Sequence, residues 1–278
     1  MIKLYAKGLG HIRPSRIVFN ALINAWSRSS EPDSAQRAEE ILKWMETKYR
    51  AGDDFVKPDD VTFCGVLNAW ANHAENGGAQ RAQQILEHME TLTAQERGFR
   101  QTVVAYNIVI KAFARSGDKN AIQSAERILE RLESRTDVHA DTTSYSSMIN
   151  CCAYYHESLE GRKEVLSVAL RSFDKLCDTD GIGPNHVCYG TLFKAINNLT
   201  DMGMERDNLL QKFFRKCCNK GQVDDFVLAQ VRNACSAELS QELMFDPIGI
   251  HGAKGEAKVR TMLRKMPSSW ERNRIDYD

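Results

Sequence analysis

The sequence predicts an all-α protein, an α-solenoid of stacked antiparallel helical hairpins. Five segments share one apolar pattern, and a second amphipathic segment follows each of them in the same phase. Prolines mark the same point in three of the five copies. Because one hairpin cannot bury its apolar faces alone, hairpins that recur along a chain must stack on their neighbours.

The first segment of each repeat opens with an aromatic residue and has large apolar residues three, four and seven positions later, with cysteine as the weakest substitute. This spacing forms one stripe along an α-helix. The opening aromatics are 44, 43, 39 and 44 residues apart, at Phe19, Phe63, Tyr106, Tyr145 and Tyr189.

The second helix of each repeat has its own apolar stripe, which in four repeats begins with a small residue that allows close helix packing. The fourth stripe is degenerate, because Ser172 interrupts it. The stripes begin at Ala38, Ala82, Ala125, Ala169 and Leu210.

Proline lies five residues before the opening aromatic at Pro14, Pro58 and Pro184. Since proline cannot continue a helix, these residues mark the turns between hairpins. The position that follows is occupied by good N-cap residues, and Asp141 takes this place without a proline. These N-cap candidates are Ser15, Asp59, Asp141 and Asn185.

Composition excludes several classes of protein. Basic and acidic residues each number 37, so the net charge is zero and indiscriminate polybasic binding of nucleic acid is not expected. The longest nearly apolar run, residues 103–110, is too short to cross a membrane. We expect no membrane partner.

Chemistry-bearing motifs are weak. The eight cysteines form no C-x-x-C and are expected to be reduced thiols. His88-Met89-Glu90 has the H-x-E form of a zinc deaminase, but no P-C-x-x-C follows, so His88 and Glu90 are interpreted as a solvated helix flank. We therefore expect no enzyme activity, metal, cofactor or small-molecule substrate.

The repeats resemble pentatricopeptide repeats, a family of helical-hairpin RNA-binding proteins. The nearest copies are K-P-D-D-V-T-F-C-G-V-L-N-A-W at residues 57–70 and V-V-A-Y-N-I-V-I at residues 103–110. Tetratricopeptide repeats are the main alternative, but no copy contains W-x-x-L-G-x-x-Y. The resemblance covers roughly residues 1–225 and implies a right-handed superhelix. At 39 to 44 residues these repeats exceed the family length of about 35.

The resemblance also sets repeat boundaries. Residues 1–15 are similar to a second helix and closing turn without a first helix, so we expect the sequence to begin inside a longer solenoid. The five repeats are assigned to residues 16–59, 60–102, 103–141, 142–185 and 186–225. Capping helices are expected at 226–245, and a loop, a short basic helix and a tail at 246–278.

In the family, a base is read by the residue after the opening aromatic (the reading position) together with the last residue of the repeat. A carboxamide at the reading position offers both a donor and an acceptor. The resemblance implies uracil for Asn with Asp and adenine for Ser with Asn, and no base for the other two combinations. The pairs are Asn20 with Asp59, Cys64 with Thr102, Asn107 with Asp141, Ser146 with Asn185, and Gly190 with Asp225.

Three residues before each reading position the family has an aliphatic residue that sandwiches the base (the wall position). β-Branched side chains suit this role because they are stiff at χ1. Alternatively, the wall residues belong to the core between repeats, and the reading residues are ordinary first-turn polar groups or N-caps. The wall residues are Ile17, Val61, Val104, Thr143 and Val187.

The sequence thus predicts a non-catalytic protein that binds single-stranded RNA with sequence preference. The resemblance implies a role in transcript processing, stability or translation in a mitochondrion or plastid, with other RNA-processing proteins as further partners. The alternative is a protein-binding solenoid scaffold of tetratricopeptide type. RNA reading requires Asn20, Asn107 and Ser146 to be exposed in a row, whereas a peptide groove would have apolar or carboxylate-clamping side chains there.

Overall fold

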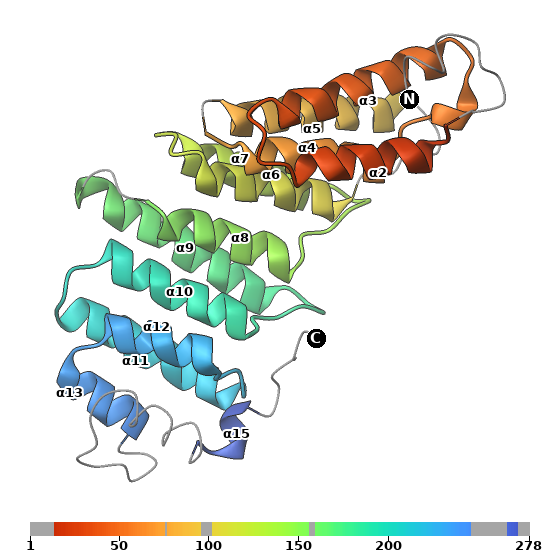
Figure 1. The fold of residues 1–278 in the computed structure, drawn as a ribbon. Coiled ribbons are helices and arrows are strands. Elements are labelled where there is room, and N and C mark those ends of the chain that lie inside the picture. The colour runs from red at the N-terminus through yellow and green to blue at the C-terminus, as the bar shows by residue number, and fades with distance from the viewer. Residues whose placement is uncertain (1–13, 76, 96–101, 156–158, 246–265, 272–278) are drawn as a thin grey trace. The chain divides into compact units, whose positions relative to one another are not determined.

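The computed structural model describes residues 14–75, 77–95, 102–155, 159–245 and 266–271. Within these ranges every regular element is a helix, as the sequence predicts (Figure 1). The chain divides into two compact units, Met1–Ala140 and Asp141–Asp278. The helix expected at residues 1–15 and the basic helix expected at 256–266 lie almost wholly outside the described residues.

Unit 1 contains three helical hairpins. The first helices α2, α4 and α6 pack side by side, and each second helix packs against the first helix of its own hairpin. In addition, α3 contacts α4 and α5 contacts α6, so these two second helices also support the next hairpin. The hairpins are α2 (Arg16–Ser27) with α3 (Ser34–Arg50), α4 (Asp60–Asn72) with α5 (Gly78–Gln95), and α6 (Val103–Arg115) with α7 (Ala121–Glu133); the short 3-10 helix η1 (Asp54–Val56) follows α3.

Unit 2 repeats the pattern. The first helices α8, α10 and α12 form the row, and α9 and α11 pack behind it. Its elements are α8 (Thr142–Ala153), α9 (Leu159–Asp178), α10 (His186–Leu199), α11 (Met204–Asn219), α12 (Asp225–Ala234), α13 (Ala237–Ser240), the π-helical turn η2 (Gln241–Phe245) and α15 (Ser268–Glu271).

The core consists of the two predicted stripes. All five opening aromatics are buried, and so are the second-helix stripes of every repeat. The degenerate fourth stripe is buried too: Ser172 is 5% exposed beside Phe173 at 0%. A single small hydroxyl therefore does not turn this face of α9 away from the core.

The four predicted N-cap residues differ in whether their side chains form a capping hydrogen bond. Asp59 and Asp141 each form a capping box, with Thr62 and Ser144 respectively. Asn185 caps α10 by accepting a hydrogen bond from the Cys188 amide at 3.0 Å. Ser15 occupies the N-cap of α2 but its side chain makes no capping hydrogen bond.

The end of the fifth repeat differs from the prediction by one residue. Asp224, not Asp225, caps α12, because its carboxylate accepts a hydrogen bond from the Val227 amide at 2.8 Å. The adjacent aspartates made the two registers indistinguishable in sequence. In the corrected register, α12 has Phe226 at the wall position and Ala229 at the reading position, so α12 continues the row of first helices.

The segment predicted as a C-terminal tail contains a short packed helix in its described part. The short helix α15 lies against α11. Its Trp270 carbonyl accepts a hydrogen bond from the Val223 amide at 2.9 Å. The Trp270 ring lies 5.7 Å from that of Phe214 in an edge-on arrangement. The contact of the partly buried Trp270 ring with Phe214 holds this segment against α11.

A buried carboxylate ties three helices of unit 1 together. Glu39 in α3 is 5% exposed. It accepts hydrogen bonds from Trp70 Nε1 in α4 and Arg81 Nε in α5, each at 3.0 Å, and lies 2.6 Å from Lys43 Nζ. Burial alone would raise the pKa of Glu39, but the hydrogen bonds from Arg81 and Lys43 outweigh it and lower the pKa to about 2.

Replacing Glu39 should destabilise the fold. We expect Glu39→Gln to reduce the free energy of unfolding by about 2 kcal/mol, because the hydrogen bonds that Trp70 and Arg81 donate to a charged acceptor become hydrogen bonds to a neutral one. Because the pKa of Glu39 is depressed in the fold, its contribution should be complete above about pH 4.5 and disappear as the pH falls towards 2. Urea unfolding at several pH values measures both effects. Glu40→Gln, at an exposed neighbour, is the control; equal losses in the two variants would contradict this role.

The Asp59 cap gives a second prediction. Asp59→Ala should cost about 1 kcal/mol, because the Thr62 amide loses the carboxylate that it contacts at 2.9 Å. Asp59→Asn should retain most of that stability, since asparagine caps as well and Asn185 does so in this chain. Thermal unfolding of the two variants separates capping from charge. A loss with Asp59→Asn as large as that with alanine would show that the ion pair with Arg16 dominates.

Candidate nucleic-acid interface

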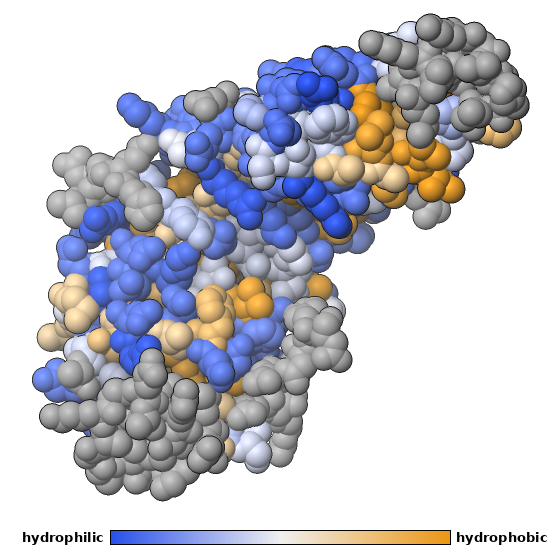
Figure 2. Space-filling view, viewed as in Figure 1, coloured by the Kyte–Doolittle hydropathy of each residue, from blue (hydrophilic) through white to orange (hydrophobic). Residues whose placement is uncertain are grey.

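The wall residues lie on the surface. Their exposed fractions are 76% for Ile17, 57% for Val61, 51% for Val104 and 39% for Val187, and Thr143 is exposed as well. The alternative that they form the core between repeats is therefore wrong. Figure 2 shows a group of hydrophobic side chains on unit 1 near the start of α2.

The first reading pair is assembled as the resemblance implies. Asn20 in α2 is half-buried and donates from Nδ2 to Asp59 Oδ1 at 3.1 Å. Its Oδ1 accepts a hydrogen bond from the Thr62 hydroxyl at 2.7 Å. Asp59 Oδ2 in turn lies 2.9 Å from Arg16 Nε. These contacts fix the orientation of the Asn20 amide, which has a second N–H and a second oxygen lone pair to offer.

The second pair also meets. Cys64 Sγ lies 3.8 Å from Thr102 Oγ1, and both residues are partly exposed. Burial raises the pKa of the Cys64 thiol to about 11. The thiol is therefore neutral at physiological pH and offers only weak hydrogen bonding.

The third reading residue is not exposed as predicted. Asn107 in α6 is only 6% exposed, although Val104 one turn earlier is 51% exposed. The sequence pattern places Asn107 at the same helical phase as Asn20, but phase alone does not set how deeply a side chain lies between its neighbours. The prediction that Asn20, Asn107 and Ser146 are all exposed is therefore wrong for Asn107.

In the fourth repeat, Ser146 in α8 is partly exposed, as is Asn185. The Asn185 oxygen is the N-cap of α10, so this side chain is held by the backbone. Asp141, assigned to the third pair, likewise caps α8 through the Ser144 amide at 2.8 Å. The N-cap interpretation therefore holds for Asp59, Asp141 and Asn185 alike, and does not conflict with a place beside the base.

The fifth reading position has no side chain and is covered. Gly190 in α10 is buried. A Cβ atom added there would overlap the Phe226 ring, because Cζ of that ring would be only 3.1 Å away and two other ring atoms would be closer still. The prediction that Gly190 reads a base with Asp225 is wrong on both residues. Phe226 was missed because a register shift of one residue put it outside the wall series.

The H-x-E motif is structural rather than a solvated flank. His88 Nε2 lies 2.6 Å from Glu46 Oε1, and the Glu90 carboxylate accepts a hydrogen bond from the Tyr106 hydroxyl at 2.8 Å and pairs with Arg131. The motif thus links neighbouring hairpins of unit 1. Among the described residues, no group of three His, Cys, Asp or Glu side chains could hold a metal ion.

All eight cysteines lie in the described ranges, and none of them forms a disulfide bond. Burial raises the pKa of Cys188 to about 11, and those of Cys151, Cys218 and Cys235 to about 12. Such thiols stay protonated at physiological pH and act as small core residues.

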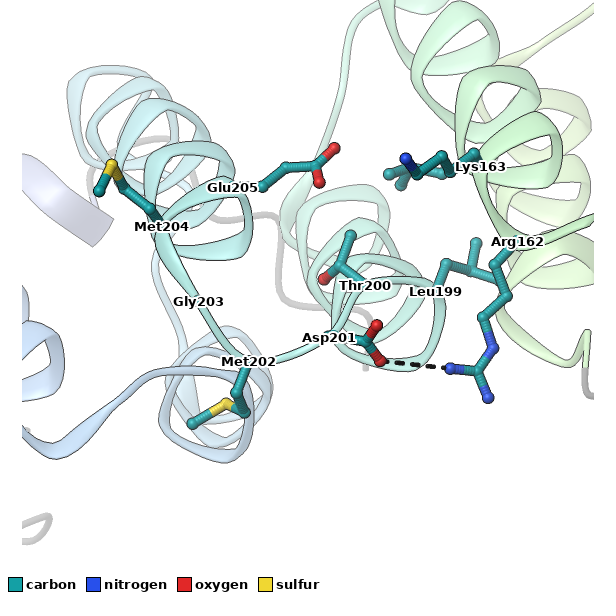
Figure 3. A pocket seen from close by; sticks show the side chains of 10 residues that line it. Arg162, Lys163, Leu199, Thr200, Asp201, Met202, Gly203, Met204 and Glu205 are labelled. Carbon is teal, nitrogen blue, oxygen red and sulfur yellow. Dashed lines mark ion pairs between the residues drawn. The ribbon is translucent and has the colours of Figure 1, made fainter. Parts of the chain in front are cut away.

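Unit 2 has an open hollow of about 670 Å³ at the turn between α10 and α11. Arg162 from α9 faces Asp201 across it, with 3.6 Å between Nη1 and Oδ1 (Figure 3). The turn is held from inside by Arg206, whose Nε donates to Thr200 Oγ1 at 3.0 Å. Leu199 and Val187 lie at opposite ends of α10, about 18 Å apart at 1.5 Å per residue. The hollow is therefore separate from the wall and reading positions.

No helix in the described ranges is long and apolar enough to span a membrane. The family model of the PPR repeat matches residues 104–121. No curated protein matches the sequence significantly. Among solved structures, the pentatricopeptide repeat protein PPR10 from maize is similar with a TM-score of 0.51 and 20% identity, over 95% of this chain and 36% of that one. The chain therefore contains a match to one PPR repeat, and its helical-hairpin fold is similar over nearly its whole length to that of a pentatricopeptide repeat protein.

Proposed function

We propose that the protein binds single-stranded RNA along the starts of its first helices and has no catalytic centre of its own. The observation that carries this proposal is the exposure of the wall residues. Among the described residues, ten large hydrophobic side chains are exposed, and half of them occupy the wall position: Ile17, Val61, Val104, Val187 and Phe226.

Random surface apolar residues need no explanation, but recurrence at one helical position does. Each wall residue lies one turn before a reading residue on the same face of its helix. An apolar side chain next to a polar one suits a nucleobase, which has an apolar face and a hydrogen-bonding edge. The first and fourth repeats, with Asn20 and Ser146 partly exposed, are the ones that we propose read bases.

A peptide-binding scaffold is the competing function. Solenoids that clamp a peptide carboxylate need basic side chains at the floor of the groove. Of the first five reading positions, the three that are partly exposed are occupied by Asn20, Cys64 and Ser146, and the carboxylate of Asp59 lies beside the first of them. This arrangement favours a base edge over a peptide carboxylate.

One further turn along each first helix, four residues after the reading position, the side chain is always an amide or a lysine. No acidic residue occurs in this row, although acidic and basic residues are equally numerous in the chain. Amides and lysines are suitable contacts for ribose and phosphate groups. The row consists of Asn24, Asn68 and Lys111 in unit 1 and Asn150, Lys194 and Asn233 in unit 2.

From the resemblance to pentatricopeptide repeat proteins, we propose that the protein acts in the processing, stability or translation of transcripts in a mitochondrion or plastid. Other RNA-processing proteins would be further partners. A passive binder can act by covering or exposing a stretch of RNA. With one lysine of this row in each unit, we expect moderate affinity, since few phosphates would be neutralised.

The reading role is tested by selecting RNAs from a random pool and measuring their affinities. We expect Asn20→Ala to weaken binding about tenfold and to flatten the preference for uracil at one nucleotide, because the oriented amide is lost. The double variant Asn20→Ser with Asp59→Asn should shift that nucleotide to adenine, since it recreates the fourth repeat's combination while keeping an N-cap.

The matched control is Gln36→Ala, which removes an exposed amide from α3 of the same hairpin. It should leave affinity and preference unchanged. A pool that yields no enriched RNA would refute RNA binding itself. An unchanged nucleotide preference in both Asn20 variants would refute the reading role.

Phosphate contact by the second polar row is tested at Lys111. We expect Lys111→Ala to weaken binding equally for all RNA sequences and to reduce the slope of log affinity against log salt by about one. Lys119→Ala, at an exposed lysine just before α7, should change neither. A wild-type slope that indicates many phosphate contacts would contradict the expectation that few phosphates are neutralised.

A further inference from the structure

The turn between α10 and α11 differs from the hairpin turns of unit 1. In unit 1 the turns at residues 28–33, 73–77 and 116–120 contain no large hydrophobic residue. The turn after α10 contains Met202, which is 62% exposed, and α11 begins with Met204 at 82%, the highest value among the exposed large hydrophobic side chains of the described residues. Apolar groups gathered at one exposed turn are typical of a surface that binds a partner.

Arg206 holds this turn in place from the inside. Its side chain is buried and donates to Thr200 Oγ1 at 3.0 Å and to the Asn197 carbonyl at 2.9 Å. It also donates to Met202 Sδ at 3.1 Å. Because the turn is fixed before a partner arrives, little of its conformational freedom would be lost on binding.

The hollow beside this turn has an apolar base and oppositely charged sides. Leu166 and Leu199 line it and are buried. Lys163 from α9 and Glu205 from α11 stand on its two sides, and in Figure 3 both side chains point into the space between these helices. Neither has an ion-pair partner among the described residues. The hollow can therefore accept an apolar side chain, while one positive and one negative group of the incoming surface face Glu205 and Lys163.

We propose that this face of unit 2 binds the same face of a second copy of the chain, with Met204 of each copy entering the hollow of the other. A two-fold dimer requires a surface that is complementary to itself. This face has an exposed apolar side chain next to an apolar hollow, and a free positive charge opposite a free negative one. Under two-fold symmetry, Lys163 of each copy faces Glu205 of the other, so two such contacts form.

The charges favour a second copy over an unrelated partner. A surface of one charge would be repelled by either Lys163 or Glu205, whereas a second copy of the chain matches both. The contact leaves the wall and reading positions uncovered, because Val187 lies at the other end of α10. The inference is thus independent of RNA binding. Since a turn and two helix ends form a small surface, we expect a reversible dimer rather than an obligate one.

The test is sedimentation of the full chain without RNA over a range of concentrations. We expect the wild type to dimerise with a dissociation constant on the order of 10 μM. Lys163→Glu and Glu205→Lys should each weaken the dimer at least about tenfold, because like charges then face each other twice across the axis. An equimolar mixture of the two variants should dimerise as strongly as the wild type, since both contacts of the mixed dimer join opposite charges again.

The apolar contact is tested separately. Met204→Glu should weaken the dimer about tenfold or more, because a carboxylate would have to enter the apolar hollow. The exposure of Met204 means that thermal unfolding of this variant should match that of the wild type. The matched controls are Lys119→Glu and Glu40→Lys, which make the same changes of charge at exposed positions of unit 1. Alone or mixed, they should dimerise as the wild type does.

Three results would overturn the proposal. A wild type that stays monomeric at every concentration would leave this face to a different partner. A dimer that Lys163→Glu, Glu205→Lys and Met204→Glu all form as readily as the wild type must use another surface. If the two charge variants weaken the dimer but their mixture does not restore it, the two side chains do not face each other across a two-fold axis.

Discussion

Close packing of neighbouring first helices is the constraint on which the interface depends. In unit 1, α2 approaches α4 so closely that a Cβ added at Gly65 would lie 2.7 Å from Ile23 Cγ2. At this separation the N-cap of one helix reaches the fifth residue of the helix before it. The Asn20–Asp59 hydrogen bond is the direct result. A looser stack would leave each N-cap serving its own helix only.

The same constraint explains why one residue type can serve two purposes. An N-cap side chain must accept a hydrogen bond from its own helix, which uses one oxygen of a carboxylate or amide. Asp59 uses Oδ1 for the Thr62 amide and for Asn20, and Oδ2 for Arg16. The cap thus fixes the neighbour of the reading amide without a separate residue. Capping, which stabilises the helix, also orients the site.

The sequence was sufficient to predict what depends on periodicity. The helix pairs and the buried aromatics follow from a 3.6-residue repeat and from prolines at turns, whereas the wall positions came from the resemblance to pentatricopeptide repeats. The sequence was insufficient where the outcome depended on how deeply a side chain is buried or on which residue begins a helix. The burial of Asn107 depends on neighbouring side chains, and the exchange of Asp225 for Asp224 depends on which of two adjacent aspartates bends into the cap. The spacing of residues in the sequence determines neither the burial of Asn107 nor the choice of aspartate.

Phe226 shows how these two limits combine. Its place in the wall series emerges only after the register of α12 is known, and its contact with Gly190 only after the packing of α10 against α12 is known. In the sequence, Gly190 lacks the side chain that a reading position requires, and Phe226 is the first residue of the predicted capping segment. In the structure, the missing side chain of one helix makes room for the ring of the next. The missing side chain at the reading position of α10 and the aromatic ring at the wall position of α12 are therefore one feature of the packing between these two helices.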